Sequence, residues 1–139
     1  MGMQLDKVQP KNKTQLKQLI NYAFKHNIYD LNFIDTSEIT DMSLLFTNCK
    51  YDFDISDWDV SNVINMGYTF YKCNVFTGKG LENWDVSKVK NMNYMFYNCK
   101  NFNCDLSDWD ISNITRWKNM FGGCDKMTIP NWYKLYHKK

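Results

Sequence analysis

A unit of about 25 residues recurs four times along this chain, and this repeat limits the folds that the chain can adopt. Four serines start the copies at intervals of 24, 26 and 25 residues: Ser37, Ser61, Ser87 and Ser112. Each serine is followed at fixed distances by Val or Ile, then Met or Trp, then Phe, and finally Cys. Repeats of this length are typical of folds whose successive units stack and bury one continuous core.

Within each unit, the pattern predicts a short strand followed by a helix. In the second copy, Trp58 and Val60 alternate with polar residues, which is typical of a strand with one buried face. Ser61 fits the N-cap of a following helix. The next apolar residues have spacings of 3, 4 and 3, which place them on one helical stripe: Val63, Met66, Phe70 and Cys73. We therefore expect an α/β solenoid of about four coils.

Both ends of the chain depart from the repeat. Thr14 fits a helix N-cap, apolar residues follow at helical spacing, and Asn27 is the expected stop. We expect this helix to cap the first coil, with a separate partner-binding helix as the alternative. A fifth strand is expected to start at Ile129 and to end in a cap, WYKLYHKK. We expect one domain over 1–139, with a lead and cap helix (1–30), repeats (31–130) and a C-terminal cap (131–139).

Composition narrows the classes of function. The net charge is +2, and the basic residues lack the clustered patch of a nucleic-acid-binding protein, so we do not expect nucleic acid as a partner. No apolar run approaches the ~18 residues of a membrane span. The first residues lack the apolar segment of a secretory signal, so we expect a cytoplasmic protein. The alternative is the cell surface, if a signal has been removed.

Two motifs resemble those of the BspA-type leucine-rich-repeat family, also known as a mycoplasma-type surface-protein repeat of unknown function. They are WDVSNV-x-NM-x-x-x-F-x-x-C and D-[IL]-S-D-W-D-[VI]-S, and the resemblance covers about residues 31–132. It implies a right-handed, leucine-rich-repeat-like β/α solenoid with a non-enzymatic binding role. Many members of that family are bacterial surface adhesins, although this chain shows no signal sequence, lipoprotein cysteine or wall anchor.

Four of the five cysteines recur at one position of the unit, and we expect them to stack as buried, reduced thiols: Cys49, Cys73, Cys99 and Cys124. Cys104 departs from the pattern and is expected to be the accessible thiol. No CxxC pair is present, so we predict no metal site and no cofactor. His26 and His137 are expected to lie on the surface without a catalytic role.

Four aspartates form a second repeated position: Asp35, Asp59, Asp85 and Asp110. On stacked strands they would stand about 5 Å apart, where two carboxylates repel by roughly 1 kcal/mol in water. We expect backbone amides at the next helix start to offset this repulsion; a basic partner surface or a bound metal is the alternative. A glycosidase also uses paired carboxylates, but it needs a cleft that an open row does not provide.

A third repeated position carries large side chains that are expected to point away from the core. These residues, with two tyrosines three positions further on, make our candidate protein-binding surface: Leu44, Tyr68, Tyr71, Tyr94 and Tyr97. Tyrosine is enriched at protein interfaces. The alternative is simple half-burial of these rings between coils.

We therefore expect a non-enzymatic protein-binding repeat protein that acts inside a cell, as an interaction module or as an effector-type or phage- or virus-encoded inhibitor. The expected partner is a protein, and the chain is expected to be a monomer or a weak oligomer. A short bacterial surface adhesin is the alternative. A hydrolase that uses the aspartates is a third possibility.

Overall fold

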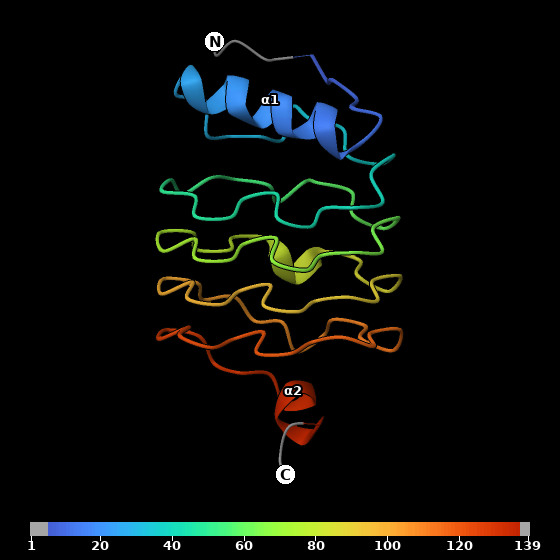
Figure 1. Cartoon of the computed structure of the whole chain (residues 1–139), viewed down its shortest axis with the longest axis vertical. Helices are drawn as coiled ribbons and strands as arrows, with labels where there is room; N and C mark the ends of the chain where they lie inside the picture. Colours follow the sequence, from blue (N-terminus) through green and yellow to red (C-terminus); the bar gives the residue numbers. More distant parts are fainter. Residues whose placement is uncertain (1–5, 137–139) are drawn as a thin grey trace.

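Stacked layers, lying between a helix at each end, make up the computed structural model (Figure 1). The structure describes residues 6–136. Helix α1 covers Lys13–Lys25, the short 3-10 helix η1 covers Leu81–Asn83, and helix α2 covers Asn131–Tyr136. The repeats between α1 and α2 are otherwise built from turns and extended segments.

Each layer is one copy of the repeat, and backbone hydrogen bonds join each layer to the next in a constant register. Between the second and third layers, the amides of Met66, Tyr68 and Phe70 donate to carbonyl oxygens 2.8–3.0 Å away, on Asn91, Asn93 and Met95 respectively. The equivalent amides of the first and third layers donate in the same way. These contacts produce only isolated parallel bridges, such as Asn65 with Asn91, and no continuous strand within residues 6–136.

The predicted right-handed β/α solenoid of about four coils, with its leucine-rich-repeat character, is therefore wrong. No sheet forms in the described residues, and turns replace the helix that was expected to start at Ser61. The reason is a left-handed backbone at two positions of each unit. In the second layer these positions are Tyr68, with a φ of 60°, and Lys72, also with a φ of 60°. A right-handed helix cannot pass through such residues.

Where helices were expected to start, the chain forms short turns that are closed by hydrogen bonds to Asp and Asn side chains. The amide of Ser61 donates to Asp59 Oδ1 at 2.9 Å, and the Ser61 hydroxyl donates to the same oxygen at 2.6 Å, so Ser61 is not a helix N-cap. Six residues later, the amide of Gly67 donates to Asn65 Oδ1 at 2.9 Å. Asp, Asn and Ser offer the backbone local hydrogen bonds that compete with helix and sheet, and here these local bonds are the ones formed.

The core lies inside the stack and is organised by a column of parallel phenylalanine rings. Phe96 lies 5.4 Å from Phe70 and 5.7 Å from Phe121, with ring planes within 7° of parallel. The apolar positions of the repeat are buried, as Trp84, Met92, Phe96 and Cys99 of the third copy show. The tryptophans also join layers, because Trp84 and its equivalents donate an indole N–H to a carbonyl of the preceding layer.

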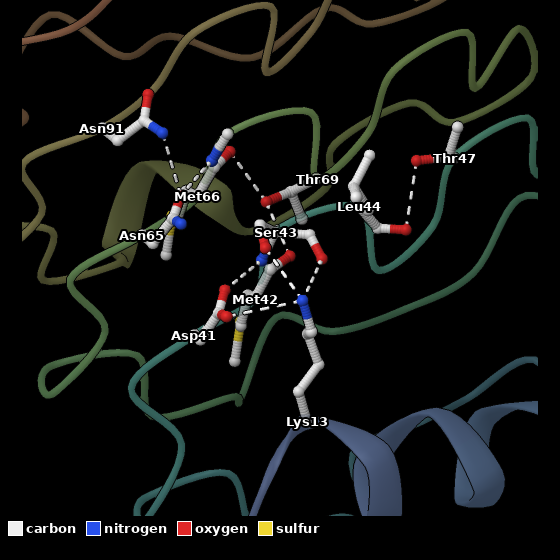
Figure 2. A network of polar contacts seen from close by, with 11 residues as sticks. Lys13, Asp41, Met42, Ser43, Leu44, Thr47, Asn65, Met66, Thr69 and Asn91 are labelled. Atoms are coloured by element: carbon white, nitrogen blue, oxygen red, sulfur yellow. Dashed lines mark hydrogen bonds and ion pairs between the residues drawn. The ribbon is translucent and has the colours of Figure 1, made fainter.

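Helix α1 covers the first layer, as expected, and begins at Lys13 with Asn12 as its N-cap instead of Thr14. It buries Leu16, Ile20 and Ala23 against the repeats. Two lysines of α1 complete the polar contacts of the first layer. Figure 2 shows Lys13, whose Nζ donates to Ser43 Oγ at 2.9 Å, and Lys17 Nζ donates to the Leu45 carbonyl at 2.7 Å.

The C-terminal end differs from the prediction. The expected fifth strand at Ile129 is absent from the described residues, and α2 forms in its place. Tyr133 of this helix packs edge-on against Phe121, with ring centroids 5.1 Å apart. Aromatic residues thus cover the last layer, as the sequence predicted. The prediction that His137 lies on the surface concerns a residue outside the described range.

Candidate protein-binding surface

The candidate tyrosines form one continuous aromatic cluster across two layers. Tyr68 stacks on Tyr94 with ring centroids 5.0 Å apart, and Tyr71 stacks on Tyr97 at 5.3 Å. Contacts within each layer join the two stacks, because Tyr68 lies 5.1 Å from Tyr71 and Tyr94 lies 5.6 Å from Tyr97. All four side chains are half-exposed, so each ring is supported by its neighbours and still reaches solvent.

Leu44 extends this cluster toward α1. Its side chain is 56% exposed, and its amide donates to the carbonyl of Gly67, the residue before Tyr68, at 3.0 Å. Figure 2 shows Leu44 beside Thr47, whose hydroxyl donates to the Leu44 carbonyl at 3.1 Å. We call Leu44 and the four tyrosines the tyrosine surface. These five residues lie on turns and not on the helix that the repeat pattern predicts within each unit.

The backbone of this surface is strained at the residues that project from it. Leu44, Tyr68 and Tyr94 have φ values of 64°, 60° and 55°. Such a conformation costs a residue other than glycine roughly 1–2 kcal/mol, and strained residues of this kind cluster at functional sites. Sequence reasoning missed this strain. The available signal was Asn119 at the same position of the fourth unit, because asparagine tolerates positive φ.

A shallow groove of about 350 Å³ lies between α1 and the first layer, next to Leu44. Its walls combine polar side chains of α1 with Ser43, Leu44 and Leu45. Burial lowers the pKa of Lys17, which lies in this wall. The groove was not predictable from the sequence, because it depends on how α1 packs on the repeats.

The competing row of aspartates has a clear role in folding. In each of the four, one carboxylate oxygen accepts the amide of the serine two positions further on, at 2.9–3.0 Å. Hydrogen bonds from Ser87 lower the pKa of Asp85, and the pKa values of Asp35 and Asp110 are lowered in the same way. Backbone amides therefore do offset the carboxylate charges, within turns and not at helix starts.

The repeated cysteines lie in the core and are hydrogen-bonded. The thiols of Cys73, Cys99 and Cys124 each donate to a phenylalanine carbonyl of the preceding layer, at 2.8–2.9 Å. Burial raises the pKa of Cys73 to about 12. Cys49 belongs to the first layer and is only half-buried.

The prediction that Cys104 is the accessible thiol is wrong. Its side chain is buried, and its Sγ donates to Glu82 Oε2 at 2.9 Å. The loop 74–83, which contains η1, places Glu82 there. Burial raises the pKa of Cys104 to about 12, with the Glu82 contact contributing in the same direction.

Nowhere in residues 6–136 do three His, Cys, Asp or Glu side chains gather so that they could hold a metal ion. No helix in this range has the length and apolar character needed to cross a membrane. His26 packs against Tyr22 with ring centroids 4.3 Å apart and ring planes tilted by 33°, and its Nδ1 lies 2.9 Å from the Tyr22 carbonyl oxygen.

Comparison with curated proteins and with solved structures finds no match. A family model described as "Mycoplasma protein of unknown function, DUF285" matches residues 14–132, which include nearly all of α1, the four layers and the start of α2. Because this match covers most of the chain, the protein belongs to the DUF285 family.

Proposed function

We propose that this protein is a non-enzymatic binding module and that it contacts a protein partner through the tyrosine surface. The observation that carries the proposal is the stacked, half-exposed cluster of Tyr68, Tyr71, Tyr94 and Tyr97. Tyrosine rings held by their neighbours lose little conformational entropy on binding, and tyrosine is one of the residues that contribute most to interface energies.

The backbone strain supports the same surface. Tyr68 and Tyr94 stand where glycine or asparagine would be tolerated at lower conformational cost, and Asn119 does stand there in the fourth layer. A large aromatic residue at such a position needs a compensating benefit. Ring stacking provides part of it, and binding a partner provides a reason for the exposed part of each ring.

The aspartate row is the weaker candidate because its carboxylates already have a role within their own layers. Asp59 and Asp85 each accept the amide of the serine two positions further on, and this hydrogen bond closes a turn. An Asn side chain can accept the same amide, as Asn65 does for Gly67. Asp→Asn variants should therefore keep the turns and change mainly the charge of this row.

Differential capture from the source cells tests the proposal. Tagged wild-type protein is compared with a Tyr68→Asn/Tyr94→Asn variant, which removes two rings and suits the left-handed backbone, and with an Asp59→Asn/Asp85→Asn variant. Co-purifying proteins are quantified by mass spectrometry, and the leading candidate is then titrated. The tyrosine variant should weaken binding by ~2 kcal/mol or more, which is roughly 30-fold in Kd.

The aspartate variant should retain binding within about threefold, because exposed charges mainly affect association rate. Loss of binding in the aspartate variant alone would place the site on the aspartate row and contradict the proposal. The location of the captured partner then distinguishes an interaction module or inhibitor inside a cell from a BspA-type adhesin.

A further inference from the structure

Charged residues divide unevenly between the two long sides of each layer. We define the tyrosine side as residues 41–50, 65–74, 91–100 and 116–125. The aspartate side is 30–40, 52–64, 79–90 and 105–115. The tyrosine side carries five basic residues against two carboxylates: Lys50, Lys72, Lys100, Arg116 and Lys118 against Asp41 and Asp125. The aspartate side carries three lysines against twelve carboxylates. The small net charge of the whole chain hides this separation.

Both carboxylates of the tyrosine side are paired with lysines. Asp41 lies 3.4 Å from Lys13 Nζ, and Asp125 lies 3.7 Å from Lys100 Nζ. Lys72 and Lys118 are exposed, and no carboxylate of residues 6–136 forms an ion pair with either. The Lys72 ammonium lies 5.2 Å from the centre of the Tyr71 ring. Unpaired positive charge therefore borders the aromatic cluster.

The two sides face in different directions because they share one core. Phe70 of the tyrosine side packs on Trp84 of the aspartate side, with ring centroids 6.2 Å apart, and Phe96 packs on Trp109 in the same way. Side chains that point inward from both sides meet between them, so the outward side chains lie on separate faces. A partner that approaches the tyrosine surface meets phenols and ammonium groups, with most of the carboxylates behind the core.

The geometry of the rings limits what this face can bind. Single-stranded nucleic acid uses aromatic faces on which bases stack. Here the tyrosines cover such faces themselves, because Tyr68 lies on a face of Tyr94 and Tyr71 on a face of Tyr97, with ring planes 20° and 14° from parallel. This arrangement disfavours base stacking. Phenol hydroxyls and ammonium groups are hydrogen-bond donors that suit carboxylates.

We propose, building on the binding function above, that the tyrosine surface recognises an acidic segment of a protein partner, in which carboxylates alternate with apolar side chains. The apolar residues would contact Leu44 and the ring edges, and the carboxylates would accept hydrogen bonds from the tyrosine hydroxyls, Lys72 and Lys118. Charge complementarity of this kind speeds association and excludes partners with the same charge.

A peptide titration tests this inference. The probe is a short fluorescent peptide that alternates Glu with Leu and Phe, measured by anisotropy beside matched peptides in which Gln or Lys replaces Glu, and beside oligothymidylate. The Glu peptide should bind at least roughly tenfold more tightly than the Gln peptide, and the Lys peptide should not bind. Raising the salt concentration should weaken binding of the Glu peptide.

Variants then locate the binding. Lys72→Glu/Lys118→Glu should weaken the Glu peptide roughly tenfold, whereas Lys79→Glu/Lys90→Glu, the matched change on the aspartate side, should leave its Kd within about twofold. Equal binding of the Gln peptide, preferred binding of oligothymidylate, no binding of any peptide, or no effect of the Lys72 and Lys118 changes would overturn the inference. Self-association of the wild-type protein in ultracentrifugation, lost in the Lys72 and Lys118 variant, would also overturn it, because the surface would then bind a second copy.

The two proposals fail in different ways. If the Glu and Gln peptides bind the wild-type protein with equal Kd and Tyr68→Asn/Tyr94→Asn abolishes the binding of both, the tyrosine surface is a binding site without a preference for acidic partners. If the Glu peptide binds with unchanged Kd to that tyrosine variant, the tyrosine surface is not its site and the acidic-segment inference is wrong, whereas the proposed function fails only if the captured partner also binds that variant with unchanged Kd.

Discussion

The rings of Tyr68 and Tyr94 stack with their centroids 5.0 Å apart, although both residues have a left-handed backbone. The amides of these two residues donate to the carbonyls of Asn93 and Lys118 in the next layer, at 2.9 Å in both cases. Stacking and interlayer hydrogen bonds therefore hold two large side chains in a conformation that they would otherwise avoid.

Backbone strain at Tyr68 should be visible in unfolding experiments. Tyr68→Ala and Tyr68→Asn both remove the ring, but Asn tolerates a φ of 60° better than Ala does. The Asn variant should therefore be more stable than the Ala variant by ~1 kcal/mol in urea unfolding. Tyr71 has no positive φ and serves as the control, at which Asn should have no such advantage over Ala. An Ala variant at position 68 as stable as the Asn variant would argue against the left-handed turn.

The phenylalanine column should dominate stability. Phe96 is fully buried and lies 4.1 Å from Phe102, between the rings of Phe70 and Phe121. Phe96→Ala should reduce the free energy of unfolding by ~3–5 kcal/mol, because a large cavity opens in a narrow layer. Calorimetry checks this change, and a melting temperature within a few degrees of wild type would contradict the packing.

Thiol labelling should follow burial. Cys49 is the half-buried cysteine, whereas Cys73, Cys99, Cys104 and Cys124 are buried, and burial raises the pKa values of all five thiols. A thiol reagent applied to the folded protein should modify Cys49 first, and peptide mapping by mass spectrometry would identify it. Labelling of Cys104 before Cys49 would show that the contact with Glu82 does not protect it.

Acid should remove stability that the aspartate turns provide. Hydrogen bonds from Ser87 hold the pKa of Asp85 below its ordinary value of 3.8. A carboxyl group whose pKa is lower in the folded protein than in the unfolded chain stabilises the fold at pH values above the unfolded pKa. This contribution is lost as the pH falls through the folded pKa. Ser87→Ala should therefore lower the melting temperature at pH 7, and its difference from wild type should shrink below pH 4. A difference that grows on acidification would contradict this.

Burial was predictable from the sequence, whereas the backbone conformation was not. The apolar residues Val63, Met66, Phe70 and Cys73 are all buried, as their spacing of 3, 4 and 3 indicated. The same spacing fits an amphipathic helix and also a chain that turns repeatedly around a narrow core. Periodicity alone cannot distinguish these two structures.

The signals for the turns were present but ambiguous. Asn65, Asn91 and Asp41 each precede a residue whose amide they accept two positions on, which indicates a local turn. Asp and Ser near a predicted helix start are also typical caps, so the same residue types fit both interpretations. Tyr68 at a positive φ was not predictable, since bulky residues rarely adopt it.

The candidate surface was predictable as a set of residues but not as a shape. The repeat places Tyr68 and Tyr94 at equivalent positions, and stacked units must bring them together. The separation of charge between the tyrosine side and the aspartate side was not predictable from the order of charged residues along the chain. It follows only from knowing which segments share a side of each layer.

The most direct test of the tyrosine surface is an NMR titration of isotope-labelled protein with the captured partner. Amide and ring signals of Leu44, Tyr68, Tyr71, Tyr94 and Tyr97 should show the largest shifts, with small changes at Asp35, Asp59, Asp85 and Asp110. Large shifts confined to the aspartates, with the tyrosine rings unchanged, would contradict the account.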